Sequence, residues 1–454
     1  MAGTERALLM RTLVILPNAI GDVICGIGIA KKFLEDGSVT WIVNSSAAGV
    51  LKNEGFELIH SPSKSVQNMN RFGARIETMR GVLKDFLFDL SKFGKWDRVV
   101  NLHLTRASSL IAGGASAQEY KGPALNDKII SDTWSDFFIS SITLGLNPLF
   151  DVAERYSMIA GFKEIVRTDF RHKRIKNERR ICLHPGSGWE TKRLSVKQAA
   201  EIADGLNEFG EVAIIGASHE AEMLDAIKRE MKSKPEEFCP GKIDIALQQI
   251  LSSCLVVTTD TWALHAARAA RIPTIALLGP TRVFPSNSGF AISPFEEPSW
   301  KDKDDTSINK INSREVVKLA ESILDGTELD SADFQNCVWD CRNDFPAPIT
   351  PLPDSGARTA QRIFAWARGK AFAEIVKSIF PELPQPILMP ANLLKQNYRE
   401  LPSIAKLKEN SNSEGRKKFP LFETTFSGKD AERIQKRWIQ RTLELISDFE
   451  QNNR

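Results

Sequence analysis

The sequence predicts an α/β protein built from two doubly wound parallel sheets, and three observations carry this prediction. Short continuous apolar runs alternate with helical patterns over about the first 330 residues, as they do in βαβ units. The stretch 255–281 alone contains a strand, a turn, a helix, a second strand and a second turn. A strongly basic segment without periodicity, residues 163–180, separates two such blocks. We therefore expect one domain over residues 1–165 and another over 181–330.

Length and composition indicate a globular protein with several domains. The chain has 454 residues, which exceeds what a single core usually supports. Its 42% hydrophobic and 26% charged residues are typical of globular chains. A net charge of +3 gives no indication of a nucleic-acid partner, and the six scattered cysteines fit a reducing compartment. No apolar run reaches the roughly 20 residues of a membrane span, so we expect a cytoplasmic protein.

The first domain begins with an apolar strand at 13–16, a turn at 17–22 and a helix over 23–33. This strand–turn–helix lacks the spaced glycines of the dinucleotide fingerprint, so it does not indicate NAD. Asp22 lies in the turn, where its carboxylate can either enter a cleft or cap the helix, and spacing alone favours the cap. His103 ends a later predicted strand and would share a sheet edge with Asp22, although a lone histidine there is more often structural.

The basic segment 166–180 is interpreted as a solvated linker between the domains. Contact with an anionic membrane surface is the second interpretation. Beyond it, strand 181–183 leads into a glycine-rich turn, where Gly188 and its neighbours allow backbone N–H groups to approach an anion and Ser187 adds a hydroxyl. Lys192 follows and can neutralise phosphate charge, with a solvated surface lysine as the alternative.

The stretch 255–281 supplies the rest of the expected ligand edge. Its first strand ends in residues that favour helix starts, among them Asp260 and Thr261. Its second strand ends at the Gly279 turn. Parallel strands bring these positions to one carboxyl edge, where ligands bind in open α/β sheets. The helix N-terminus at that edge offers free N–H groups to a phosphate.

Residues 331–454 are expected to form an extension that is proline-rich at first and then mostly helical. Its amphipathic helix over 429–449 would pack on the body of the protein or on another subunit. Cys337 and Cys341 have a spacing that two metal ligands can share. Structural zinc normally takes four ligands, so we predict no metal site.

Three sequence runs resemble one known family. The run LVILPNAIGDVICGIGIAKKF is similar to the start of glycosyltransferase family 9, the ADP-heptose lipopolysaccharide heptosyltransferases and their relatives. The runs ICLHPGSGWETKRLSVKQAAEIADGL and VVTTDTWALHAARAARIPTIALLGPT resemble the two donor-domain motifs of that family. The motifs occur in the family's order and spacing and frame about residues 12–325.

The resemblance implies a GT-B fold, in which two Rossmann-like domains face a cleft, with the acceptor in the first domain and the donor nucleotide in the second. It implies inverting transfer without a metal or other cofactor. The donor would be a nucleotide sugar such as ADP-heptose, and the acceptor a lipopolysaccharide core or a protein. Peripheral association with the inner membrane and a homo-oligomer formed through the extension are left open.

The resemblance also assigns roles to single residues. Asp22 matches the family's proposed catalytic base. Lys192 matches a donor-phosphate contact that would also stabilise the leaving group. The remaining donor-binding positions are Ser187, Gly188, Asp260, Thr261, Trp262, His265, Gly279 and Thr281. Trp262 departs from the pattern, because the family usually has glycine there, and we expect its ring either to contact the donor or to pack under a neighbouring loop.

Two other functions remain as alternatives. A catalytically silent protein that binds a nucleotide sugar, or serves as a scaffold, would explain Trp262 and the long extension. A sugar-nucleotide epimerase can share the two-domain fold. The presence of Asp22 and Lys192 argues against the silent protein, and the family 9 motifs, which are not those of the epimerases, argue against the epimerase.

Overall fold

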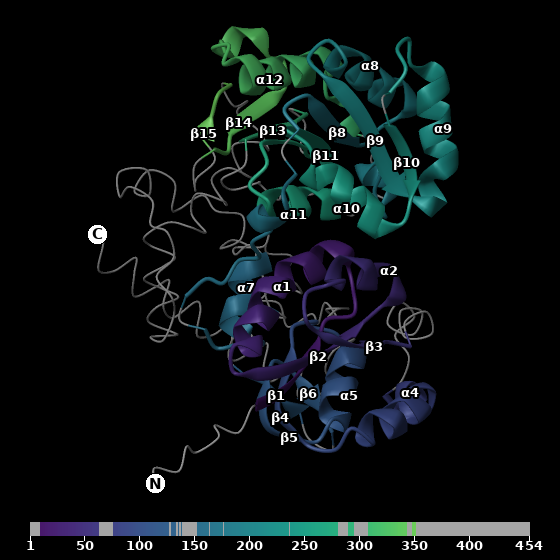
Figure 1. Cartoon of the computed structure of the whole chain (residues 1–454), viewed down its shortest axis with the longest axis vertical. Helices are drawn as coiled ribbons and strands as arrows, with labels where there is room; N and C mark the ends of the chain where they lie inside the picture. The colour runs from purple at the N-terminus through teal and green to yellow at the C-terminus, as the bar shows by residue number, and fades with distance from the viewer. Residues whose placement is uncertain are drawn as a thin grey trace, which may run out of the picture. The chain divides into compact units, whose positions relative to one another are not determined.

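The computed structural model describes residues 10–62, 76–126, 129–132, 135, 138, 152–162, 164–175, 177–235, 237–279, 289–294, 307–342 and 347–350. These residues fall into two compact units that divide between Thr168 and Asp169 (Figure 1). Each unit is an α/β structure around its own sheet, and each is described separately.

The first unit contains a five-stranded parallel sheet in the order β3-β2-β1-β4-β5. Its strands are β1 Met10–Ile15, β2 Gly37–Val43, β3 Glu57–His60, β4 Trp96–Asn101 and β5 Ala117–Lys121. Its helices are α1 Ile20–Leu34, α2 Ser45–Ala48, α4 Ile76–Ser91, α5 Arg106–Gly114 and α7 Val152–Ile159. A short antiparallel pair of strands, β6 Ala124–Leu125 and β7 Ile129–Ile130, follows β5 in the chain. The chain order reverses between β1 and β4, which is the switch point of a doubly wound sheet.

The second unit contains an eight-stranded sheet in the order β10-β9-β8-β11-β12-β13-β14-β15. Its strands are β8 Arg180–His184, β9 Glu211–Ala217, β10 Glu237–Gly241, β11 Leu255–Thr259, β12 Thr274–Leu277, β13 Gly289–Ser293, β14 Cys337–Asp340 and β15 Ala347–Pro348. Its helices are α8 Val196–Leu206, α9 Ala221–Glu230, α10 Ile243–Leu251, α11 Trp262–Ala269 and α12 Ser313–Asp325. The strands from β10 to β13 are parallel, and β14 and β15 are added antiparallel. The switch point here lies between β8 and β11.

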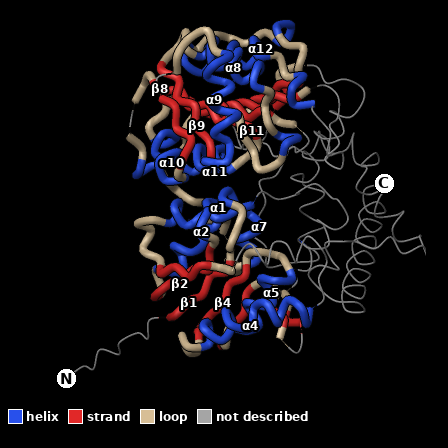
Figure 2. Tube along the Cα trace, turned by 90° about the vertical axis from the view of Figure 1, so that its right-hand side faces the viewer, coloured by secondary structure: helices blue, strands red, loops and turns tan. Residues whose placement is uncertain are grey.

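Both sheets are covered by helices on their two faces, which explains why their strands are continuous apolar runs (Figure 2). In the first unit, α1 and α7 cover one face and α4 and α5 the other. In the second unit, α8 packs between α9 and α12 on one face, and α10 and α11 pair on the other. The arrangement of sheets and helices confirms the predicted class, α/β with doubly wound parallel sheets.

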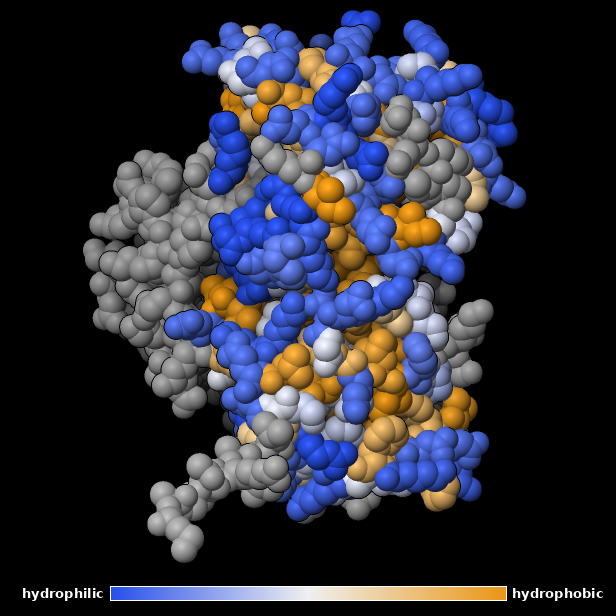
Figure 3. All heavy atoms as spheres, viewed as in Figure 1, coloured by the Kyte–Doolittle hydropathy of each residue, from blue (hydrophilic) through white to orange (hydrophobic). Residues whose placement is uncertain are grey.

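The face of the molecule in Figure 3 shows hydrophobic residues in several separate patches among hydrophilic ones.

The structure differs from the sequence predictions in two places. Helix α1 begins at Ile20 rather than at residue 23, because the carboxylate of Asp22 accepts a hydrogen bond from the Ala19 N–H and closes the first turn. The beginning of the predicted extension belongs to the second sheet, because Cys337–Asp340 pairs with β13. The predicted helices of the extension lie outside the described residues.

The chain passes from one unit to the other through a segment that is anchored on both sides. The hydroxyl of Thr168 donates to the carbonyl of Ile24 at 2.6 Å and accepts from the Gly28 N–H at 2.9 Å. In an uninterrupted α-helix the Gly28 N–H would donate directly to the Ile24 carbonyl. Here the hydroxyl of Thr168 lies between these two groups and bonds to both. Two residues later, Phe170 is fully buried, and its N–H donates to the carbonyl of Ala269 at 2.8 Å. The segment predicted as a solvated linker thus contains two fixed points.

Candidate functional site

Asp22 lies at the switch point of the first sheet, in the first turn of α1. The turn follows β1, and its hydrogen bond from the Ala19 N–H spans 3.3 Å. The side chain is half-buried. N–H groups at a helix start lack partners within the helix, and the Asp22 carboxylate satisfies one of them. Asp22 therefore caps its helix, as spacing favoured, and does so at the edge where open α/β sheets bind ligands.

Two further titratable side chains lie near Asp22. His103 follows β4, the strand beside β1, and burial lowers the pKa of its imidazole while the charge of Asp22 acts in the opposite direction. Tyr156 comes from α7, which packs on α1, and it is 5% exposed. Burial, together with the carboxylate of Asp22, raises the pKa of Tyr156 well above its usual value. The carboxylate thus has a neutral imidazole and a protonated phenol as neighbours.

His103 and Tyr156 differ in how far the sequence indicated them. The parallel sheet was expected to bring His103 to the edge of Asp22, and the structure confirms this placement. Tyr156 was missed, because it lies far along the chain in a helix without a motif. Only the packing of α7 on α1 brings it to the site. An aromatic residue on the buried face of a short helix gives no local signal that separates a site residue from a core residue.

The switch point of the second sheet carries a loop, residues 185–194, that is tied together by its own hydrogen bonds. The hydroxyl of Ser187 accepts from the Trp189 N–H at 3.2 Å, and its carbonyl accepts from Nε of Arg193 at 2.7 Å. The N–H of Leu194 donates to the carbonyl of Pro185 at 3.1 Å. These bonds fix the turn and its side chains on a rigid strand end.

Lys192 crosses from this loop to the turn after β11. Its ammonium lies 2.9 Å from Oδ2 of Asp260 and 3.5 Å from the carbonyl of the same residue. It also lies 5.2 Å from the ring centre of Trp189, within the range of a cation–π contact. The side chains of Lys192 and Asp260 are 14% and 8% exposed. The predicted donor residues on the two loops are therefore in direct contact, and a partly desolvated cation lies at the sheet edge.

A second cluster of polar groups fixes the start of α11. The hydroxyl of Thr261 lies 3.1 Å from Nδ1 of His184 and 3.2 Å from the hydroxyl of Thr258. Burial lowers the pKa of His184 to about 4, against the opposing charge of Glu220, so its ring is neutral near pH 7. The ring of Trp262 meets the His184 ring edge to face at 5.5 Å. Trp262 is thus the first residue of the helix and packs partly against a buried histidine.

The other predicted donor positions lie near this edge of the sheet or outside the described residues. Gly279 lies two residues after the end of β12, and a side chain there would lie 3.3 Å from the carbonyl of Thr191, so this turn is next to the loop of residues 185–194. Open space surrounds the Cα of Gly188, where no atom would lie within 4 Å of an added Cβ. His265 lies one turn into α11 and is half-buried. Thr281 lies outside the described residues.

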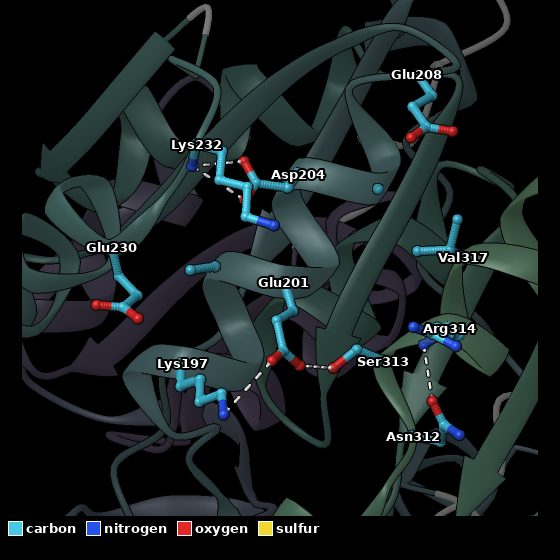
Figure 4. Close-up of a pocket in the computed structure, with 12 residues that line it drawn as sticks. Lys197, Glu201, Asp204, Glu208, Glu230, Lys232, Asn312, Ser313, Arg314 and Val317 are labelled. Carbon is cyan, nitrogen blue, oxygen red and sulfur yellow. Dashed lines mark hydrogen bonds and ion pairs between the residues drawn. The ribbon is translucent and has the colours of Figure 1, made fainter.

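A separate pocket of about 690 Å³ lies on the outer side of α8 and α12 (Figure 4). Acidic and basic side chains both line it: Glu201, Asp204, Glu208, Glu230, Lys197, Lys232 and Arg314. Glu201 accepts from the hydroxyl of Ser313 and lies 4.0 Å from Lys197, while the carboxylate of Asp204 accepts the N–H of Lys232. Because carboxylates outnumber cationic side chains in its lining, the pocket offers no selective site for an anion.

The described residues provide no group of three or more histidine, cysteine, aspartate or glutamate side chains that could hold a metal ion. The side chains of Cys337 and Cys341 are both buried, and burial raises the pKa of Cys341 far above its usual value. Among the helices that the structure describes, none is long and apolar enough to cross a bilayer.

Comparison with known proteins gives matches over most of the chain. Residues 142–293 match the family model "Glycosyltransferase family 9 (heptosyltransferase)". The chain is 22% identical over 352 residues to lipopolysaccharide heptosyltransferase 1 of Campylobacter coli, covering 72% of this chain and 94% of that protein.

Solved structures of similar proteins match at lower identity. ADP-heptose lps heptosyltransferase II of E. coli is 18% identical, with a TM-score of 0.49, over 70% of this chain and 99% of that one. A glycosyl transferase of family 9 from Veillonella parvula is 18% identical, also with a TM-score of 0.49, over 70% and 98%. The family match and the Campylobacter relative both support a heptosyltransferase-like glycosyltransferase of family 9.

Proposed function

We propose that this protein transfers a heptose or a similar sugar from a nucleoside-diphosphate donor to a lipopolysaccharide core or a protein, with inversion and without a metal. The contact between Lys192 and the turn at Asp260 carries the proposal. It holds a cation at the carboxyl edge of the second sheet, beside the N-terminus of α11. A diphosphate placed there would meet both the ammonium and free backbone N–H groups.

The proposed reaction is a single displacement. Asp22 accepts the proton of the acceptor hydroxyl, and the hydroxyl oxygen forms a bond to the anomeric carbon as the bond from that carbon to the diphosphate oxygen breaks. A single displacement inverts the configuration at that carbon. The leaving nucleoside diphosphate gains negative charge, which Lys192 and the N-terminus of α11 stabilise.

Asp260 has a defined part in this proposal. Its carboxylate repels a diphosphate but attracts the ammonium of Lys192, at 2.9 Å and with both side chains mostly removed from water. We therefore assign Asp260 to positioning Lys192. The other proposed donor contacts are the N–H groups and hydroxyls of Ser187 and Thr261, together with Gly188, Trp262, His265 and Gly279. Thr281 remains a donor position that the sequence alone proposes.

The donor sugar and the acceptor are extended from the relatives. The Campylobacter relative is named as a lipopolysaccharide heptosyltransferase, and the E. coli protein as an ADP-heptose lps heptosyltransferase. We extend both features to this chain, with ADP-heptose as the donor. A cytoplasmic location with peripheral association with the inner membrane is a further part of the proposal. An oligomer formed through the extension is part of the same proposal.

The proposal is tested by incubating the full-length protein with a panel of nucleotide sugars and candidate acceptors and measuring nucleotide release. We expect release to require an acceptor and to persist in excess EDTA. Lys192→Met should weaken binding of the nucleoside diphosphate roughly tenfold or more, because a charged hydrogen bond contributes about 1.5–3 kcal/mol. Lys197→Met is the matched control, since Lys197 is a 79% exposed lysine on α8.

Two outcomes would contradict parts of this proposal. Loss of activity on chelation, with recovery on adding magnesium or manganese, would exclude the metal-free mechanism. Tight binding of a nucleotide sugar without turnover on any acceptor would favour the catalytically silent alternative.

A further inference from the structure

Trp189 is the exception among the tryptophans that the structure describes. Trp41, Trp96 and Trp339 are at most 2% exposed, and Trp262 is half-buried. Trp189 is 57% exposed. Tryptophan is strongly buried on average in folded proteins, because its ring removes a large apolar area from water. An indole left in solvent at a substrate edge therefore calls for an explanation.

The position of this ring is fixed by its backbone. The Trp189 N–H donates to the Ser187 hydroxyl at 3.2 Å, and the Trp189 carbonyl accepts from the Lys192 N–H at 3.0 Å. The loop is closed again by the bond from Arg193 to the Ser187 carbonyl. An exposed ring on such a loop is preorganised, so a ligand that contacts it need not order the loop first.

One contact of the ring is already known. The ammonium of Lys192 lies 5.2 Å from the ring centre. The same ammonium is the proposed diphosphate contact and is also held by Asp260. The indole therefore lies immediately beside the position proposed for the diphosphate, while more than half of its surface still faces solvent.

Resting on the proposed function, we propose that Trp189 is a stacking surface for a ring of the donor that adjoins its diphosphate. A nucleotide sugar carries such rings on both sides, a flat nucleobase and a sugar with an apolar C–H face. Both stack on indole, and nucleobase stacking is the stronger of the two when the planes are parallel. Trp189 would thus act with Trp262, which is partly occupied by its contact with His184.

The test compares three ligands that differ in their rings. Inorganic pyrophosphate, ADP and ADP-heptose are titrated calorimetrically into the full-length wild-type protein and into Trp189→Ala. We expect pyrophosphate affinity to change less than twofold. Affinity for a ring-bearing ligand should fall about fivefold or more, the equivalent of roughly 1 kcal/mol for one aromatic stack. A loss shared by ADP identifies the base, and a loss confined to ADP-heptose identifies the sugar.

Two results would overturn the inference. Unchanged affinity for all three ligands would mean that the ring contacts none of them. An equal loss for all three, pyrophosphate included, would mean that Trp189 acts only through Lys192. Failure of the proposed function is recognised separately, because Lys192→Met would then leave pyrophosphate binding unchanged.

Two controls separate stacking from a general effect. Trp189→Phe keeps a smaller aromatic face and should recover part of the lost affinity. Ile245→Ala removes another exposed apolar side chain of the second unit, 47% exposed on α10, and should change nothing. Acrylamide quenching gives an independent readout. Trp189→Phe should lose a fraction of the quenchable fluorescence of the wild type. ADP-heptose should protect the same fraction from quenching in the wild type. If ADP-heptose protects none of it, the proposal is contradicted.

Discussion

Asp22 caps its helix and is also our proposed general base. As a helix cap it accepts the Ala19 N–H, which holds the carboxylate in place at the sheet edge. A general base must be positioned to reach the proton that it removes, so the same hydrogen bond would serve the proposed role. The neutral His103 and the protonated Tyr156 add no positive charge that would compete for the same carboxylate.

The prediction at this residue concerns rate rather than binding. We expect Asp22→Asn to lower the transfer rate roughly 100-fold to 10,000-fold, because removing a general base typically has an effect of that size. Nucleotide affinity should stay within a few-fold, since the donor residues lie in the other unit. Steady-state kinetics and a nucleotide titration measure both. Asp85→Asn, on the exposed side of α4, is the control, and near-normal turnover by folded Asp22→Asn would sink the assignment.

Trp262 permits a prediction with two separable outcomes. Its ring is half-buried against His184, so part of it remains available to a donor. We expect Trp262→Gly to change nucleotide affinity or donor preference about tenfold without unfolding the unit. Nucleotide titrations and thermal melts of both proteins measure this. A lower melting temperature with unchanged affinity and preference would assign the ring to packing alone.

At the scale of elements, α1 depends on a residue outside itself. A Cβ at Gly28 would lie 2.7 Å from the backbone carbonyl of Arg167, so no side chain fits while Thr168 bridges the helix. The hydrogen bonds of Thr168 to α1 are therefore possible only because residue 28 has no side chain. Because Asp22 begins the same helix, the segment that leaves the first unit also helps to hold the candidate base.

Substitution of this glycine should be destabilising, against the usual trend for helices. We expect Gly28→Ala to lower the free energy of unfolding by about 1–3 kcal/mol, the usual effect of overpacking. Gly81→Ala in α4 is the matched control, because nothing lies within 4 Å of its added Cβ. The control should be neutral or should stabilise by roughly 0.5–1 kcal/mol. Chemical denaturation measures both, and equal effects would contradict the bridge.

At the scale of the whole molecule, two buried neutral histidines make stability depend on pH. His184 and His103 lie in different units, and burial lowers the pKa of each, that of His184 to about 4. An unfolded histidine titrates near pH 6.5, so the unfolded chain takes up the proton first as the pH falls. We therefore expect the contribution of His184 to stability to be complete above about pH 6.5 and to be lost as the pH falls toward 4.

This decline is a prediction that one substitution can test. His184→Gln removes the titrating group, so its free energy of unfolding should depend less on pH between 6.5 and 4 than that of the wild type. Urea denaturation at a series of pH values measures the slope. His219→Gln, a solvent-exposed histidine in the same unit, is the control. An unchanged slope in His184→Gln would show that other groups govern the acid transition.

The sequence predicted well what depends on neighbouring residues in the chain. Apolar runs such as Leu255–Thr259 located the strands, and their parallel order placed Lys192 and Asp260 at one edge of the sheet, where the structure shows them as an ion pair. It failed where distant packing decides. Nothing local shows that Tyr156 lies beside Asp22, that Phe170 is buried within a basic segment, or that Cys337 begins a strand of the second sheet.

The two anchors around Asp169 define where such a protein can be recombined. Thr168 is fitted to the first unit and Phe170 to the second, so Asp169 is the single residue between them. A chimaera that exchanges one unit for that of a relative should be joined there. A junction a few residues to either side would combine Thr168 or Phe170 of one protein with the unit of the other, so that one unit would lose the residue that packs on it. A chimaera made to change the donor specificity should therefore keep Thr168 with the first unit and Phe170 with the second, because each residue contacts a helix of its own unit.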